Sequence, residues 1–332
     1  MKAPIQIAIN LADPVYSGKY HSRQSHPSDL PAVITRSQSA GCTKLMITGS
    51  SLQSSHEAIE LSLQYPRVCH ATVGIHPCST LDFTTHAGGA PGLLSDLSTL
   101  IKRHQYPTGP VTAIGEIGLD YDRLSLSPAA TQREFFEAQL DMAIALGKLT
   151  DDVNAPCPLP LFLHMRAAAE DFTRILRPRL DRFPKRGVVH SFTGSVAEMH
   201  ALVEMGFAIG INGCSVRTDE GLAVVKELPL TALMVETDGP WCEIRPSHAS
   251  ARFLADRDEE EWEKELEEQW KAVKKEKFQM GRMVKGRNEP CLIGKVVRVV
   301  AGVKGIAREV VAQRAWENSV KMFGLGVDLN SD

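Results

Sequence analysis

Eight short, apolar and largely uncharged segments recur at fairly even intervals along the chain, and they restrict its fold more than any other feature. They lie at residues 5–9, 44–48, 68–73, 111–115, 160–163, 187–189, 207–211 and 233–236. Segments that are apolar throughout predict strands buried on both faces, as in parallel sheets. Helical patterns separate most of them, for example at residues 30–34, 135–144, 169–180 and 196–205. Two further helices are predicted near the end, at residues 290–301 and 306–323.

Eight strand–helix units in a chain of 332 residues predict an α/β fold, the (β/α)8 TIM barrel. An open, doubly wound parallel sheet is the alternative, but that fold normally carries a glycine-rich phosphate loop after its first strand. Residues 10–14 read Asn-Leu-Ala-Asp-Pro and contain no such loop. We therefore expect one barrel domain over residues 1–332, with insertions at about residues 148–158 and 243–289.

The composition narrows the range of partners and compartments. With 37 basic and 40 acidic residues the net charge is −3, so nucleic acid could only be bound by a local basic patch. No apolar run approaches the ~20 residues of a transmembrane helix, and the N-terminus lacks the features of a signal peptide. The seven cysteines form no C-x-x-C pair, which excludes a zinc finger and disfavours a disulfide framework. We expect a cytoplasmic and/or nuclear protein that is not secreted and needs no obligate protein partner.

The second insertion carries charges that change sign along its length. Residues 256–268 contain nine acidic and two basic side chains, and residues 271–287 contain seven basic and one acidic side chain. One interpretation is an amphipathic surface helix with a solvated charged face. The other is a lid whose basic half meets a polyanion.

Polar residues stand at or directly after the end of every predicted strand. They are Asn10, Thr48, His76, Glu116, His164, His190, Asn212 and Asp238. In a barrel the carboxyl ends of the strands surround one mouth, which carries the active site. Glu116, His164, His190 and Asp238 would then converge as two imidazoles and two carboxylates. Such a donor set suits Zn, Mn or Mg with water completing the shell, and Glu116 could bridge two ions ~3.5–4 Å apart.

Other residues near these strand ends are candidates for supporting roles. Asp120 and Glu236 could each accept a hydrogen bond that orients a metal ligand. For His76, contact with a scissile phosphate and a hydrogen bond that fixes the His76–Pro77 turn are both open. The candidate phosphate contacts are Arg166, Lys285 and Arg287. Cys242 could lie nearby, but no neighbouring base predicts a nucleophilic role for it.

Several of these residues lie in segments that resemble the TatD family of metal-dependent deoxyribonucleases, which are amidohydrolase-like barrels, and in particular its eukaryotic branch. The segments include residues 73–77 (Val-Gly-Ile-His-Pro), 113–120 (Ala-Ile-Gly-Glu-Ile-Gly-Leu-Asp), 161–166 (Leu-Phe-Leu-His-Met-Arg), 188–194 (Val-Val-His-Ser-Phe-Thr-Gly) and 236–241 (Glu-Thr-Asp-Gly-Pro-Trp). The resemblance extends from residue 5 to about residue 323.

The resemblance implies hydrolysis of DNA phosphodiester bonds, from a 3′ end or as an endonuclease, by water activated on a divalent metal. The metal is expected to be Mg²⁺, with Mn²⁺ or Zn²⁺ as alternatives, and one or two ions per chain. Its ligands would be Glu116, His164, His190 and Asp238. The catalytic candidates are Glu116, Asp238 and His76, and Asp238 could accept the water's proton.

The first strand departs from the wider family, whose members often carry a metal-binding His-x-His pair there. This chain has Asn10-Leu11-Ala12 instead, and the eukaryotic branch shares the absence of the pair, so Asn10 or Asp13 is a candidate to hold a metal-bound water. One rival function is a metal-dependent hydrolase of C–N or ester bonds, such as a D-aminoacyl-tRNA deacylase. The missing pair and the lack of a candidate metal-bridging lysine disfavour a typical amidohydrolase. A second rival, a non-catalytic adaptor, leaves the strand-end ligands without a role.

Overall fold

Eight parallel strands follow one another in chain order around a single sheet, as the sequence predicts. A computed structural model describes residues 4–147, 157–255 and 261–325. The strands are β1 (Gln6–Ile9), β4 (Leu45–Ile47), β5 (Cys69–Val73), β6 (Val111–Asp120), β7 (Leu161–Arg166), β8 (Gly187–His190), β9 (Ala208–Ile211) and β10 (Leu233–Val235). A separate short hairpin joins β2 (Lys19–Tyr20) to β3 (Arg23–Gln24).

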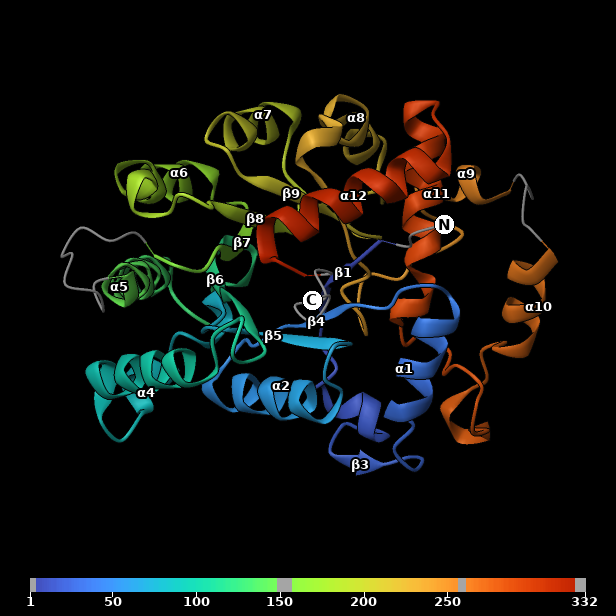
Figure 1. The fold of residues 1–332 in the computed structure, drawn as a ribbon, viewed down its shortest axis with the longest axis horizontal. Coiled ribbons are helices and arrows are strands. Elements are labelled where there is room, and N and C mark those ends of the chain that lie inside the picture. Colours follow the sequence, from blue (N-terminus) through green and yellow to red (C-terminus); the bar gives the residue numbers. More distant parts are fainter. Residues whose placement is uncertain (1–3, 148–156, 256–260, 326–332) are drawn as a thin grey trace, which may run out of the picture.

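Helices surround these strands in Figure 1, which gives the layer order of a barrel. They are α1 (Leu30–Ser39), α2 (Leu52–Gln64), α3 (Asp82–Thr85), α4 (Gly89–His104), α5 (Ala129–Gly147), α6 (Ala169–Leu176), α7 (Val196–Glu204), α8 (Asp219–Glu227), α9 (Arg252–Ala255), α10 (Glu261–Gln269), α11 (Ile293–Lys304) and α12 (Arg308–Phe323). No helix in the described parts of the chain is long and apolar enough to cross a membrane.

Hydrogen bonds between β1 with the residue after it and the segment directly after β10 close the ring. The Asp238 N–H donates to the Ala8 carbonyl at 3.0 Å, and the Asn10 N–H donates to the Gly239 carbonyl at 2.9 Å. The buried Gln6 side chain donates to the Thr237 hydroxyl at 2.6 Å. These contacts confirm the barrel and exclude the open, doubly wound sheet, in which the first and last strands need not meet.

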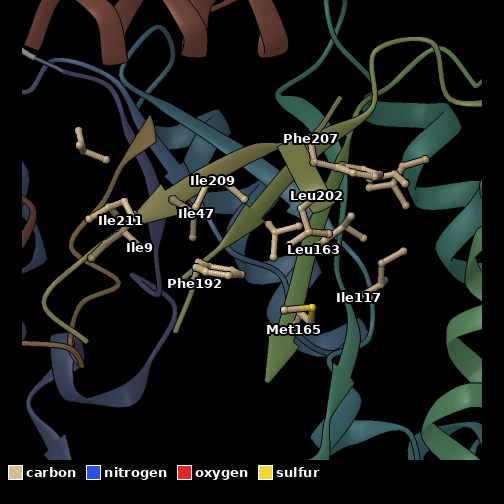
Figure 2. Close-up of a cluster of buried hydrophobic side chains, with 14 of the residues drawn as sticks. Ile9, Ile47, Ile117, Leu163, Met165, Phe192, Leu202, Phe207, Ile209 and Ile211 are labelled. Carbon is tan, nitrogen blue, oxygen red and sulfur yellow. The ribbon is translucent and has the colours of Figure 1, made fainter. Parts of the chain in front are cut away.

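Alternate residues of each strand face opposite sides of the barrel wall. Phe162, Val188 and Met234 belong to a cluster inside the barrel, whereas their neighbours Leu163 and Val189 pack between the strands and the helices. Figure 2 shows part of this outer layer, including Leu163, Ile209 and Phe207. The inner cluster also contains Phe323 and Leu325, so the end of α12 covers the barrel where the strands begin. In Figure 1, α12 crosses the ring of strands accordingly.

Several element boundaries differ from the sequence prediction, and three of the differences have a visible local feature. Strand β6 continues to Asp120 instead of ending at residue 115, and its register against β7 is irregular between Ile114 and Ile117. Helix α6 ends at Leu176 and continues as a 3₁₀ turn, because Pro178 has no N–H to donate and crowds the preceding turn. Helix α11 begins at Ile293 after the 3₁₀ turn Pro290–Leu292.

The two predicted insertions have different outcomes. Most of the first, residues 148–156, lies outside the described residues. In the second, helix α10 ends at Gln269 and the basic stretch follows as loops with the short 3₁₀ turn Lys275–Lys277. Figure 1 shows α10 at the edge of the molecule. The basic stretch packs against the N-terminal part of the chain, where Phe278 stacks on His26 with ring centroids 4.2 Å apart.

Candidate metal centre

A cleft of about 810 Å³ opens where the barrel strands end, and its lining contains all the predicted strand-end ligands. His76, Glu116, His164, His190 and Asp238 all border it, together with Asn10 and Arg166. These side chains come from β6, β7, β8 and the segments after β1, β5 and β10. The barrel therefore brings together residues that lie far apart in the sequence.

Strand periodicity explains which side chains reach this cleft. His164 follows the inward-facing Phe162 by two positions, and His190 follows Val188 in the same way. Because successive side chains alternate, both imidazoles continue the inner face of the barrel to its mouth. Gly210 of β9 has no side chain, which leaves room for His190 and Glu236. A Cβ at this position would lie 2.8 Å from Glu236 Oε2 and 2.9 Å from the His190 Cα.

Three imidazoles converge on a single oxygen of the buried Glu116 carboxylate. The distances to Glu116 Oε1 are 2.7 Å from His190 Nε2, 2.9 Å from His164 Nδ1 and 3.3 Å from His76 Nε2. Burial alone would raise the pKa of Glu116, but attraction to His76 and His190 outweighs it and holds that pKa well below its usual range. Glu116 is therefore an ionised carboxylate surrounded by nitrogen donors.

Buried carboxylates lie on the far side of two of these rings. His164 Nε2 lies 3.2 Å from Asp120 Oδ2, and His190 Nδ1 lies 3.5 Å from Glu236 Oε1. Glu236 is fixed in turn, because its Oε1 accepts from the Ser191 N–H at 2.7 Å. A carboxylate behind an imidazole orients the ring and selects the nitrogen that faces a metal ion. The structure thus gives Asp120 and Glu236 the positions expected of supporting residues.

The residues around Glu116 fit a divalent cation. Within the described part of the chain, the buried Nδ1 atom of His164, which faces Glu116, has no partner in hydrogen-bonding geometry. One candidate metal group is His76, Glu116 and His164, whose ligand atoms lie within 4.8 Å of one another. Imidazole nitrogen together with carboxylate oxygen suits Zn²⁺ or Mn²⁺, and Mg²⁺ when water supplies further oxygen ligands.

His76 is better placed to donate a hydrogen bond than to bind a metal. Its Nδ1 accepts from the Cys78 N–H at 3.0 Å, so the neutral ring carries its proton on Nε2. Nε2 is also the atom that faces Glu116. The hydrogen bond from the Cys78 N–H fixes the turn after β5 and also sets the His76 tautomer that presents an N–H to the cleft. A turn-fixing hydrogen bond and a contact with the scissile phosphate are therefore compatible roles for His76.

Asp238 lies at the edge of this group. Its Oδ1 accepts from Asn10 Nδ2 at 3.1 Å and its Oδ2 from the Cys242 thiol at 3.4 Å. Burial, with repulsion from Glu236 and Glu116, raises the pKa of Asp238 to about 7 despite attraction to His190. A carboxyl group that titrates near neutral pH is suited to accept a proton from water. Asp13, which the sequence offered with Asn10 as a candidate to hold a metal-bound water, caps a 3₁₀ turn, where its side chain accepts from the Val15 N–H at 2.9 Å.

Two of the three predicted phosphate contacts do not line the cleft. Arg166 does, with its Nη1 3.7 Å from Asp120 Oδ2. Arg287 is buried and pairs with Asp29 at 2.6 Å and Glu289 at 2.8 Å, so its prediction as a substrate contact is wrong. A buried guanidinium needs such carboxylate partners, and this network anchors the C-terminal end of the second insertion. Lys285 is exposed but is not among the lining residues.

Arg123 and Arg217 border the cleft although the sequence analysis did not select them. Arg123 lies three positions after the end of β6, and Arg217 lies six positions after the end of β9. A search for basic residues in every loop that follows a strand would have found both. With Arg166 they supply positive charge beside the candidate metal centre.

Comparison with known proteins agrees with this geometry. Residues 19–324 match the model of the family described as TatD related DNase. The chain is 42% identical to "Deoxyribonuclease Tat-D" of Schizosaccharomyces pombe over 317 residues, which cover 96% of this chain and 94% of that protein. It is 34% identical to "3'-5' ssDNA/RNA exonuclease TatD" of Edwardsiella piscicida over 75% of this chain and 85% of that protein.

A solved structure described as an uncharacterized amidohydrolase from Saccharomyces cerevisiae superimposes with a TM-score of 0.86 at 34% identity. The match covers 97% of this chain and 100% of that chain. The resemblance found in the sequence motifs and the barrel fold are both confirmed. The chain therefore belongs to the TatD-related DNase family and is a hydrolase of phosphodiester bonds.

Proposed function

We propose that this protein is a divalent-metal-dependent deoxyribonuclease that hydrolyses DNA from a 3′ end, as an endonuclease, or in both ways. A relative named as a 3′-5′ exonuclease for single-stranded DNA and RNA supports the first mode. The single observation that carries the proposal is the convergence of three imidazoles on Glu116 Oε1. Such a cluster beside Arg166 and Arg217 combines a metal centre with charges that attract a phosphate.

In this proposal Glu116, His164, His190 and Asp238 hold one or two divalent ions, of which Mg²⁺ is the first candidate. When bound, the metal would lower the pKa of water and offset negative charge on the phosphodiester. Asp238 accepts the proton from the attacking water. His76 donates its Nε2–H to a phosphoryl oxygen, and Arg166 holds the same group by charge-assisted hydrogen bonds.

The test is a nuclease assay on metal-stripped protein with end-labelled single- and double-stranded DNA. Mg²⁺, Mn²⁺ and Zn²⁺ are added back separately. We expect no cleavage without metal and restored cleavage with at least one ion, and the labelled products will separate exonuclease from endonuclease action. Cleavage that persists in excess chelator, or that no ion restores, would contradict the proposal.

The same assay addresses the alternative chemistry when aminoacyl-tRNA and small amides are added as substrates. Hydrolysis of those bonds in preference to DNA would favour a metal-dependent hydrolase of C–N or ester bonds.

The location proposed is the cytoplasm and/or the nucleus, because the seven cysteines are free thiols, as is usual in reducing compartments.

A further inference from the structure

Trp241 is an aromatic side chain exposed at the mouth of the cleft. It is 58% exposed and lines the cleft three positions after Asp238. Leu126, 50% exposed, also lines the cleft, whereas the similarly exposed Leu63 on α2 does not. A single exposed apolar side chain is ordinary on a protein surface, so it is the place of Trp241 in the cleft lining, close to Asp238, that makes it a candidate contact for a ligand.

The backbone that carries Trp241 is held firmly from two sides. The Trp241 N–H donates to the Asp238 carbonyl at 3.0 Å, and the Trp241 carbonyl accepts from Asn288 Nδ2 at 2.8 Å. Asn288 is buried, and the same amide group donates to the Thr237 carbonyl at 2.8 Å. The exposure of the ring therefore results from a fixed turn, and little backbone entropy would be lost when a ligand covers it.

The surroundings indicate which ligand would cover the ring. Arg123, Arg166 and Arg217 border the same cleft and supply charge for a phosphate backbone. An exposed indole offers a flat face on which any nucleobase can stack, and this combination of charge with an aromatic platform is typical of single-strand binding. A base inside a duplex keeps both faces stacked and cannot use the ring without unpairing.

We propose that Trp241 stacks on an unpaired nucleobase next to the scissile phosphate, so that the cleft selects single-stranded ends. This inference rests on the proposed nuclease function and assigns the specificity of that site to one side chain. It makes Trp241 a binding residue for the base, separate from the groups around Glu116 that would act on the phosphate.

The test combines protein variants with altered substrates. Trp241→Ala and Trp241→Phe are compared with wild type for binding to a fluorescently labelled single strand by anisotropy, under chelating conditions that prevent cleavage. Parallel strands carry an abasic residue at the last or the penultimate 3′ position. Leu63→Ala is the matched control, because it removes an equally exposed apolar side chain outside the cleft.

We expect Trp241→Ala to weaken binding of the complete strand by about tenfold, since stacking of one base is worth roughly that factor. Trp241→Phe should retain most of the affinity. Wild type should bind one of the abasic strands about as weakly as Trp241→Ala binds the complete strand. For that abasic strand, Trp241→Ala should cause little further loss of affinity.

Equal losses for complete and abasic strands, or unchanged binding in Trp241→Ala, would overturn the inference. Unchanged nucleic-acid binding would instead leave the ring as a contact for a protein partner. Because binding is measured without cleavage, an inactive wild type would refute the proposed nuclease function and still leave the role of Trp241 decided by the anisotropy data.

Discussion

Three imidazoles surround the Glu116 carboxylate, with nitrogen atoms 2.7, 2.9 and 3.3 Å from its Oε1. Replacing it with alanine would remove the shared acceptor while leaving the barrel wall of apolar residues intact. We expect Glu116→Ala to reduce phosphodiester hydrolysis by at least about 10²–10³-fold, the usual scale for losing one group that stabilises the transition state. Initial rates on end-labelled DNA measure this.

Circular dichroism spectra and thermal unfolding of the same preparation control for folding of Glu116→Ala. A folded variant that turns over DNA at a rate near that of wild type would exclude Glu116 as a metal ligand.

His190 makes metal binding sensitive to pH. Burial disfavours its charged form, but attraction to Glu116 and Glu236 outweighs burial and raises the pKa of His190 well above its usual value. Below that raised pKa the ring is protonated and cannot bind a metal, so apparent metal affinity should fall as pH drops through it. The fall should begin above about pH 6.5, the ordinary imidazole value.

Activity measured against pH at several metal concentrations tests this expectation. Higher metal concentration should move the acid limb to lower pH, since metal and proton compete for the same nitrogen. A limb that stays in place would show that another group titrates.

At the scale of the element, strand β9 contributes space rather than a ligand to the centre. A Cβ on Gly210 would crowd both His190 and Glu236, at 2.9 and 2.8 Å from their nearest atoms. We expect Gly210→Ala to destabilise the fold by about 1–3 kcal/mol and to weaken metal binding, because overpacking displaces the imidazole. Chemical unfolding and metal titration measure the two effects.

Gly294→Ala in α11 is the matched control, since nothing lies within 4 Å of a Cβ there. It should be neutral or stabilising by up to about 1 kcal/mol. Equal effects of the two substitutions on metal affinity would refute the steric explanation.

The basic half of the charged insertion is the second element with a testable role. Lys274 and Lys277 are exposed, and the described part of the segment lies outside the cleft lining. If these lysines contact distant phosphates, replacing both with alanine should raise KM for long single strands and reduce the salt slope of log affinity by ~0.7 per contact. Cleavage of a dinucleotide should be unaffected.

Lys102→Ala on α4 is the control for a general loss of positive charge, because Lys102 is exposed and outside the cleft. If long and short substrates respond alike, or neither responds, the segment is a solvated surface and the lid interpretation fails.

At the scale of the whole molecule, a buried histidine away from the cleft links stability to pH. His70 of β5 is buried, and both ring nitrogens lack a hydrogen-bond partner within the described residues. Burial, with a smaller contribution from Lys44, lowers the pKa of His70 to about 4 from an ordinary value of 6.5. The neutral ring thus stabilises the fold fully above about pH 6.5, and this contribution is lost as pH falls towards 4.

The loss should amount to about 3 kcal/mol between those limits. Urea unfolding at several pH values measures it, and His70→Phe should flatten the dependence in this range. The exposed His200→Phe variant is the control, and a His70→Phe curve parallel to that of wild type would contradict the assignment.

Much of the candidate site could be predicted because its information is local. His164 and His190 each come directly after a run of apolar residues, in β7 and β8, and alternation along the strand fixes the face on which each side chain lies. The parallel arrangement then brings all strand ends to one mouth. The eight strands, the barrel and the residues around Glu116 therefore follow from runs of apolar residues and their polar ends.

The tertiary structure alone decided the roles that depend on distant partners. Arg287 resembled a surface base in the sequence, yet it pairs with Asp29, 258 positions away, inside the protein. Arg217 and Trp241 border the cleft only because the loops after β9 and β10 fold towards its mouth. Short-range patterns determine which residues form a strand, whereas burial and charge pairing depend on which strands become neighbours, and only the closed barrel fixes that.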